Sequence, residues 1–253
     1  MVISTVYAVL FYLATFLMVA GVGMKVFKYA TTPVPLNIVV SPAPRTKRGV
    51  FFRMFREVIF FESLFKSNKW IWLFGYLFHW GMLIVLLRHF RYFTLDTWWW
   101  VEIISPIGKL MAFAMIAGLL GLWARRIFQE RIRYISAPSD HLMLALLLGI
   151  AGSGTLMSYV THTDIINVKA YFLGLMRFDL SHTLPANPIL LAHLGMVVIL
   201  MIIFPISKLL HVPGVFFSPS RTMVDNARDK RRVSKWARNL PPLPEGIPTK
   251  EEG

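Results

Sequence analysis

The sequence predicts an all-α integral membrane protein, a bundle of five transmembrane helices. Of its 253 residues, 56% are hydrophobic and only 16% are charged, whereas soluble domains carry about 25% charged residues. Apolar stretches near the roughly 20 residues that a bilayer requires recur five times. The predicted spans are residues 2–27, 70–94, 104–125, 139–160 and 187–210.

The first two segments have different roles. Residues 2–27 are too long for an ordinary signal peptide and lack a small-residue cleavage site, so we expect a retained anchor. Residues 28–69 comprise a Pro-rich linker up to residue 46 and an amphipathic stretch over residues 50–66. Apolar residues follow helical spacing in that stretch, which predicts a helix on the membrane surface or against a partner. These residues are Phe51, Phe55, Val58, Phe61 and Phe65.

The sequence also predicts the structure of the segments that follow span four. Residues 161–186 contain enough apolar residues for a short surface helix, and Pro185, Asn187 and Pro188 are typical of the start of span five. We expect the membrane domain to cover residues 1–211. Residues 212–253 form a basic, Pro-rich tail that docks a partner or meets anionic lipid.

The distribution of basic residues predicts the orientation. Residues 25–69, 125–133 and 208–253 hold 22 of the 27 Lys and Arg residues. Because Lys and Arg accumulate in cytoplasmic loops, we expect the N-terminus outside and the tail in the cytoplasm of a prokaryotic inner membrane. The net charge of +14 then reflects topology. It does not indicate nucleic-acid binding, since no basic stripe lies in a foldable soluble domain.

Four histidines lie in two of the predicted spans, and they are the strongest indication of function. His79 and His89 lie in span two, and His193 and His211 in span five. Ionisable groups inside a membrane are costly and usually functional. The two spans run in opposite directions, so topology pairs His79 with His211 at the cytoplasmic side and His89 with His193 at the outer side.

Two haems held between spans two and five explain these pairs best. At about 1.5 Å per helical residue, the histidines are about 15 Å apart in span two and about 27 Å apart in span five, which tilted helices can accommodate. Imidazole suits haem iron, and two imidazoles leave no open coordination position. A proton-relay transporter and a haem-free membrane anchor or assembly subunit remain the alternatives.

Two cations near the outer pair are candidates for a quinone site. Lys109, at the outer start of span three, could donate a hydrogen bond to a quinone carbonyl, or could reach the interface as an ordinary surface lysine. Arg88 could act likewise or pair with a haem propionate. The chain has no cysteine, which excludes c-type haem and Cys-ligated iron–sulfur clusters in it. Electrons must therefore be exchanged with a separate carrier.

These positions together resemble a known family. The spacing of His79, His89 and Lys109, followed by His193 and the motif FPISKLLH that ends at His211, is similar to the cytochrome b (gamma) subunits of respiratory nitrate reductases. The resemblance implies five helices with two b haems and quinol reacting near the outer haem. By the same resemblance, His89 and His193 bind the outer haem, His79 and His211 bind the inner haem, and Lys109 lines the quinone site.

A narrower resemblance covers the segments TTPVPLNIVVSPAPRTKRG and REVIFFESLFKSNKWIWLFGYLFHWGMLIVLLRHFRYF. They are similar to the DsrM-type cytochrome b subunits of membrane Dsr complexes in sulfur metabolism. This implies electron exchange between menaquinone or ubiquinone and a cytoplasmic, DsrK-like iron–sulfur subunit. That subunit would act on a thiol/disulfide or trisulfide sulfur carrier, with DsrP-, DsrJ- and DsrO-like subunits alongside. The chain would be a redox subunit rather than a complete enzyme.

Overall fold

Five long apolar helices make up the body of the protein. The computed structural model describes residues 1–33, 39, 42–226 and 239–241, and its regular elements in those residues are all helical. In this described part of the chain, five helices are long and apolar enough to cross a membrane, as the sequence predicts. They are α1 (Val2–Thr31), α4 (Lys69–His89), α5 (Trp99–Phe128), α7 (Pro138–Leu156) and α9 (Pro188–Ile203).

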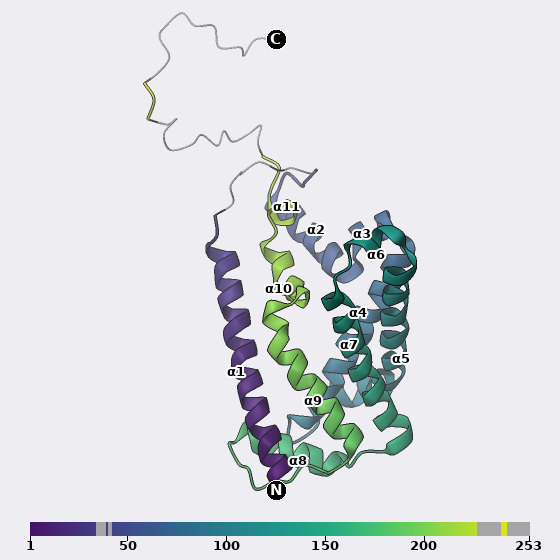
Figure 1. Ribbon diagram of the computed structural model, residues 1–253. Coiled ribbons are helices and arrows are strands. Elements are labelled where there is room, and N and C mark those ends of the chain that lie inside the picture. Colours follow the sequence, from purple (N-terminus) through teal and green to yellow (C-terminus); the bar gives the residue numbers. More distant parts are fainter. Residues whose placement is uncertain (34–38, 40–41, 227–238, 242–253) are drawn as a thin grey trace, which may run out of the picture.

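The helices stand side by side in a bundle (Figure 1). Helix α1 packs against α9, α9 against α7, α7 against α5, and α5 against α4. One end carries Met1 and α8 (Ile165–Met176), and we call it the Met1 end. We call the opposite end the basic end; it carries α2 (Lys47–Phe60), α3 (Glu62–Ser67), α6 (Glu130–Ile135) and α11 (Pro219–Thr222).

Helices α4 and α5 form the most extensive helix pair, and glycines make their close approach possible. A Cβ atom at Gly118 would lie 2.6 Å from the backbone oxygen of Phe74. A Cβ atom at Gly81, on the facing helix, would lie 2.8 Å from the backbone oxygen of Met111. Small residues at such contacts let membrane helices approach backbone to backbone. Helix α4 is therefore held at a fixed distance from α5.

Tyrosine hydroxyls join α1 to the rest of the Met1 end. Tyr171 in α8 donates a hydrogen bond of 2.7 Å to the Ser4 carbonyl. Tyr7 in α1 donates one of 2.7 Å to the Leu191 carbonyl in α9. Because lipid offers no hydrogen-bond partner, buried hydroxyls need acceptors within the protein. The short helix expected within residues 161–186 is confirmed as α8.

The amphipathic stretch is two helices rather than the single helix that its spacing predicts. Helix α2 (Lys47–Phe60) ends at Phe61, whose backbone is left-handed with φ 52°, and α3 (Glu62–Ser67) follows. The break turns Phe61 out of the exposed stripe, so that its ring contacts His79 with ring centroids 5.1 Å apart. Phe51, Phe55 and Phe65 remain exposed.

Span five also departs from its prediction. Asn187 caps α9 through the Ile189 and Leu190 amides, and Pro188 is its first residue, as expected. However, α9 ends at Ile203, and the chain continues through short turns η3 (Phe204–Ile206) and η4 (Lys208–Leu210) to α10 (His211–Gly214) and η5 (Val215–Phe217). Pro205 causes the break, because it has no amide hydrogen for the helical ladder. The continuous helix assumed between His193 and His211 is therefore wrong.

Parts of two predicted features are not placed by the structure. Residues 34–38, 40 and 41 of the Pro-rich linker and the basic cluster of residues 228–238 lie outside the described residues. The part of the tail that is described returns to the bundle. There, Arg221 in α11 forms an ion pair of 2.9 Å with Glu57 in α2 and donates a hydrogen bond of 2.6 Å to Ser63 in α3.

Candidate functional site

The structure brings His79 and His211 together at the basic end. His79 projects from α4 and His211 from α10, and their ring centroids are 5.9 Å apart with an interplanar angle of 85°. Metal–imidazole bonds of about 2.0 Å place two imidazoles on opposite sides of one metal ion with centroids roughly 6 Å apart. The centroid separation of His79 and His211 is thus compatible with two imidazoles that would hold one metal ion between them.

The hydrogen bonds of these histidines select one tautomer. Nδ1 of His79 lies 2.7 Å from the Gly75 carbonyl oxygen, and Nδ1 of His211 lies 3.1 Å from the Lys208 carbonyl oxygen. A carbonyl oxygen can only accept, so each Nδ1 carries the hydrogen and each Nε2 keeps its lone pair. This second contact orients an imidazole ligand and makes its free nitrogen more basic.

The second pair, His89 and His193, lies toward the Met1 end. His89 comes from α4 and His193 from α9, and the two are near enough that a charge on one imidazole would act on the other. Nδ1 of His89 donates to the Val85 carbonyl oxygen at 2.6 Å, which leaves Nε2 free as in the first pair. His193 is 9% exposed, so its ring lies within the bundle.

His193 obtains its hydrogen bond from a side chain. The Ser153 hydroxyl in α7 donates to the Gly149 carbonyl at 2.6 Å, and its oxygen lies 2.9 Å from Nδ1 of His193. Because the single hydroxyl hydrogen is directed at Gly149, the oxygen accepts from the imidazole. A Cβ atom at Gly154 would lie 3.3 Å from the His193 ring. Helix α7 thus provides a hydrogen-bond acceptor for His193 and, at Gly154, space for its ring. The spacing of the histidines in the sequence indicates neither contribution.

Arg88 and Arg91 flank His89 and have unused donors. Within the described residues, the buried Nε atoms of both side chains have no hydrogen-bond partner. Arg88 lies across Gly108 of α5, where a Cβ atom would be 2.8 Å from Arg88 Cδ. Buried guanidinium groups are usually paired with an anion. Their placement beside His89 fits the carboxylates of a haem, which is one of the two roles that the sequence suggests for Arg88, the other being a donor to a quinone.

Lys109 is on α5, next to Gly108, but its side chain is exposed. No hydrogen bond or ion pair of its ammonium group is found in the part of the chain that the structure describes. Successive helical residues are turned by about 100°, so Lys109 points away from the Gly108–Arg88 contact. The structure does not bring Lys109 against either histidine pair, and its role in a quinone site stays a prediction.

The segment before His211 is anchored by a buried carboxylate at the start of α7. Asp140 in α7 is buried and accepts from the Ala137 amide at 3.1 Å. It also accepts from Lys208 Nζ at 2.6 and 2.9 Å and from Arg126 at 3.4 Å. Lys208 and Asp140 are 68 residues apart. Such a separation explains why a reading of local motifs does not find the pair.

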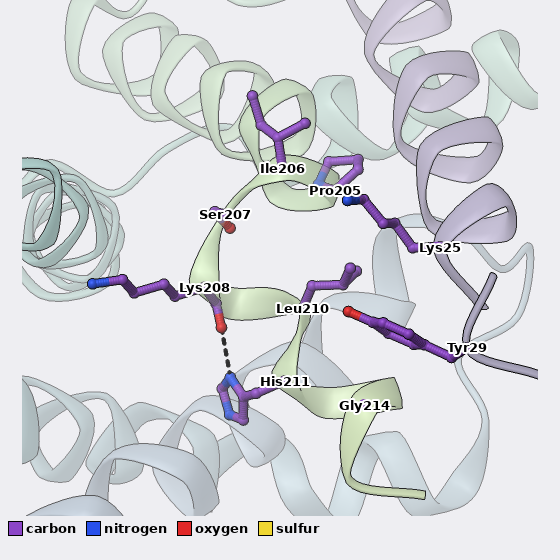
Figure 2. Close-up of a pocket in the computed structure, with 9 residues that line it drawn as sticks. All are labelled: Lys25, Tyr29, Pro205, Ile206, Ser207, Lys208, Leu210, His211 and Gly214. Atoms are coloured by element: carbon purple, nitrogen blue, oxygen red, sulfur yellow. Dashed lines mark hydrogen bonds between the residues drawn. The ribbon is translucent and has the colours of Figure 1, made fainter. Parts of the chain in front are cut away.

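A pocket adjoins the same segment between α1 and the turns after α9 (Figure 2). Its volume is about 320 Å³, and His211, Lys208, Lys25 and Tyr29 are among its lining residues. Among the described residues, no three His, Cys, Asp or Glu side chains gather to hold a metal ion. Two imidazoles per site are the number of protein ligands that a haem iron takes when a porphyrin supplies the others.

Comparison with known proteins decides the family. Residues 61–226 match the nitrate reductase gamma subunit family. The chain belongs to this family. The match includes all four paired histidines, Lys109 and Asp140. The resemblance inferred from the sequence is thereby confirmed.

Two curated relatives of this nitrate reductase gamma family member carry the same description, Hdr-like menaquinol oxidoreductase cytochrome b-like subunit. The protein of Archaeoglobus fulgidus is 35% identical over 281 residues, which cover 93% of this chain and 85% of the relative. The protein of Archaeoglobus profundus is 32% identical over 284 residues, which cover 92% of this chain and 82% of the relative. Together with the five apolar helices in the described residues, the family match indicates a multi-pass membrane protein.

Proposed function

We propose that the chain is a diheme cytochrome b that passes electrons across the membrane between menaquinol or another quinol and a cytoplasmic iron–sulfur subunit. The observation that carries this proposal is the pairing of four imidazoles, with His79 and His211 at a centroid distance of 5.9 Å. The relatives described as menaquinol oxidoreductase subunits support the quinol. The sequence resemblance to DsrM-type cytochrome b subunits also supports the proposal.

The residues of the chain would hold two haems in defined places. His79 and His211 would ligate the inner haem at the basic end, and His89 and His193 the outer haem. Haem b ligated by two imidazoles supplies a one-electron carrier with no open position for oxygen chemistry. The four Nδ1 hydrogen bonds would hold each ring in place, and Arg88 and Arg91 would neutralise propionates of the outer haem.

Quinol would react at the Met1 end, near the outer pair. Lys109 is exposed on the side of α5, where a quinone could approach from the lipid. An ammonium donor there would stabilise negative charge that develops on a quinone oxygen. Arg88 is the second candidate for this role, although its contact with Gly108 places it closer to the haem propionates in our proposal.

The orientation follows from the basic residues. We propose that the Met1 end faces outward and the basic end faces the cytoplasm of a prokaryotic inner membrane. An electron that crosses from the outer to the inner haem would then be coupled to the membrane potential, by about 2.3 kcal/mol per charge per 100 mV.

The electron acceptor or donor at the basic end would be a separate protein. The chain has no cysteine, and the relatives are described as Hdr-like. A DsrK-like iron–sulfur subunit that acts on a disulfide or trisulfide carrier fits this position, with DsrP-, DsrJ- and DsrO-like subunits completing the complex. The chain would be the membrane redox subunit of that oxidoreductase.

Haem content tests the proposal directly. The protein, expressed with its partner subunits and ample haem, is purified and assayed as the pyridine haemochrome. We expect two haem b per chain, falling to one in His89→Ala or His193→Ala. A colourless protein would refute the proposal and favour a membrane anchor. One haem per chain would refute the diheme arrangement, and two haems retained in both variants would refute the ligand assignment.

A further inference from the structure

The backbone segment that carries His211 differs from the segments that carry the other three paired histidines. His79, His89 and His193 project from the long helices α4 and α9, whose backbones are held by continuous hydrogen-bond ladders. His211 begins the four-residue helix α10, after a break at Pro205 and the three-residue turn η4. A chain segment of this kind has few backbone hydrogen bonds of its own. Its position must therefore be set by side-chain contacts.

Lys208 links His211 to another membrane helix through two different groups. Its backbone carbonyl accepts the Nδ1 hydrogen bond of His211 at 3.1 Å, as Figure 2 shows. Its ammonium group extends away from that contact and donates to both oxygens of Asp140 in α7, at 2.6 and 2.9 Å. The acceptor that orients the imidazole is thus carried by the same residue that α7 holds.

Asp140 is itself fixed from several sides. Its carboxylate accepts from the Ala137 amide and from Arg126 of α5. Arg126 also donates to Ser136 at 3.0 Å. The side chain of Asp140 is 6% exposed, whereas that of Lys208 is 75% exposed. A buried carboxylate with several donors is rigid, and removing one partner of such a group has effects well beyond an ordinary surface ion pair.

We propose that Asp140 and Lys208 are positioning residues that set the orientation of His211 as a ligand of the inner haem. This inference rests on the proposed function. The route runs from Arg126 and Asp140 to the Lys208 ammonium, and from the Lys208 carbonyl to Nδ1 of His211. Loss of the ion pair frees η4 to move, and the His211 ring turns with it. Hydrogen bonding at the outer nitrogen of an axial imidazole tunes both its orientation and the potential of the metal.

The test compares two lysines whose ion pairs look alike. Lys208→Met removes the ammonium group and keeps the backbone carbonyl. Lys66→Met is the matched control, because Lys66 forms an ion pair of the same 2.6 Å length with Glu62 and its side chain is 70% exposed. Asp140→Asn removes the negative charge of the pair, and Lys208→Arg keeps the positive charge. Each variant is purified as the complete complex with its haems.

The measurements are the low-spin EPR signal of each haem, which depends on the angle between the two axial imidazole planes, and potentiometric titration followed at the haem absorbance. We expect Lys208→Met and Asp140→Asn to alter the signal and midpoint potential of one haem, or to reduce two haems per chain to one. Lys66→Met should match the wild type, and Lys208→Arg should retain most of the wild-type signature. Lys208→Met and Asp140→Asn remove the same interaction. The double variant that combines them should therefore change the haem signals, potentials and content no more than either single variant does.

Two results would overturn the inference. If both haem signals of Lys208→Met equal those of Lys66→Met, the ion pair does not position His211. If both haems change equally, the pair supports the whole bundle rather than one ligand. Because Lys208 is mostly exposed, its variant stays informative even if Asp140→Asn does not accumulate. Absence of haem from the wild type would instead refute the proposed function, which keeps the two failures distinct.

Discussion

The contact between α4 and α5 leads to a prediction of defined size. In Gly118→Ala, the new Cβ atom would lie 2.6 Å from both the Phe74 carbonyl oxygen and the Phe78 amide nitrogen. Non-bonded heavy atoms prefer separations of about 3.5 Å or more, so the helices must part by about 1 Å. Neither contact atom can rotate away, because both belong to the α4 backbone.

The cost should be that of an overpacked core, about 1–3 kcal/mol. For a chain of this size, each kcal/mol lowers Tm by roughly 2–4 °C, so we expect a decrease of roughly 2–12 °C. The same movement displaces α4, in which Phe78 precedes His79 and contacts its ring at a centroid distance of 4.8 Å. We therefore expect haem to be released at a lower temperature as well.

Thermal unfolding in detergent, followed by tryptophan fluorescence and haem absorbance, measures both effects. Gly23→Ala in α1 is the matched control, because a Cβ atom there meets nothing within 4 Å. Alanine in place of glycine favours a helix by about 1 kcal/mol, so the control should be as stable as the wild type or slightly more stable. If Gly118→Ala unfolds at the same temperature as Gly23→Ala, the close packing of α4 on α5 is not what the structure indicates.

Three further predictions concern other contacts. Ser153→Ala should shift the midpoint potential of one haem while the other is unchanged, because His193 loses its 2.9 Å partner; unchanged potentials in a redox titration would argue against that role. Lys109→Ala should slow quinol-dependent haem reduction while both haem spectra stay intact, and wild-type kinetics would leave Lys109 as an interfacial residue. Burial raises the pKa of Tyr171 from 10.0 to about 12. The stability that the protonated Tyr171 hydroxyl contributes is therefore complete below pH 10 and is lost as the pH rises through about 12. The free energy of unfolding of Tyr171→Phe should fall less steeply with pH over that range than that of the wild type. Equal slopes for the two proteins would contradict this assignment.

The membrane spans could be predicted from sequence because their signal is local. A span needs about 20 consecutive apolar residues, whose backbone groups are satisfied within the same helix. Hydrophobicity therefore located all five, and Asn187 with Pro188 located the start of α9. The helix ends differ from the predicted bounds: α1 runs to Thr31 and not to residue 27, and α5 begins at Trp99 and not at residue 104. Helix ends depend on capping and on neighbouring segments as much as on hydrophobicity.

Two departures from the sequence prediction arose where tertiary contacts overrode a local pattern. Phe61 fits the apolar stripe of residues 50–66, yet it adopts a left-handed backbone and packs against His79 and Tyr76. Span five is predicted to run to residue 210, but its helix ends at Ile203, before Pro205. The Pro205 ring lies where a Cβ atom at Gly21 of α1 would meet it at 2.6 Å, so the break is packed against another helix.

The sequence by itself determined the class of the protein, its five spans, and the four histidines whose pairing follows from antiparallel spans. These depend on composition, spacing and direction, which are properties of the chain. Only the tertiary structure decided the partners of those histidines: Ser153 for His193, and the Asp140–Lys208 pair for the segment of His211. Such contacts join residues far apart in the chain. In the membrane interior, where water cannot satisfy polar groups, they depend on how the helices pack together.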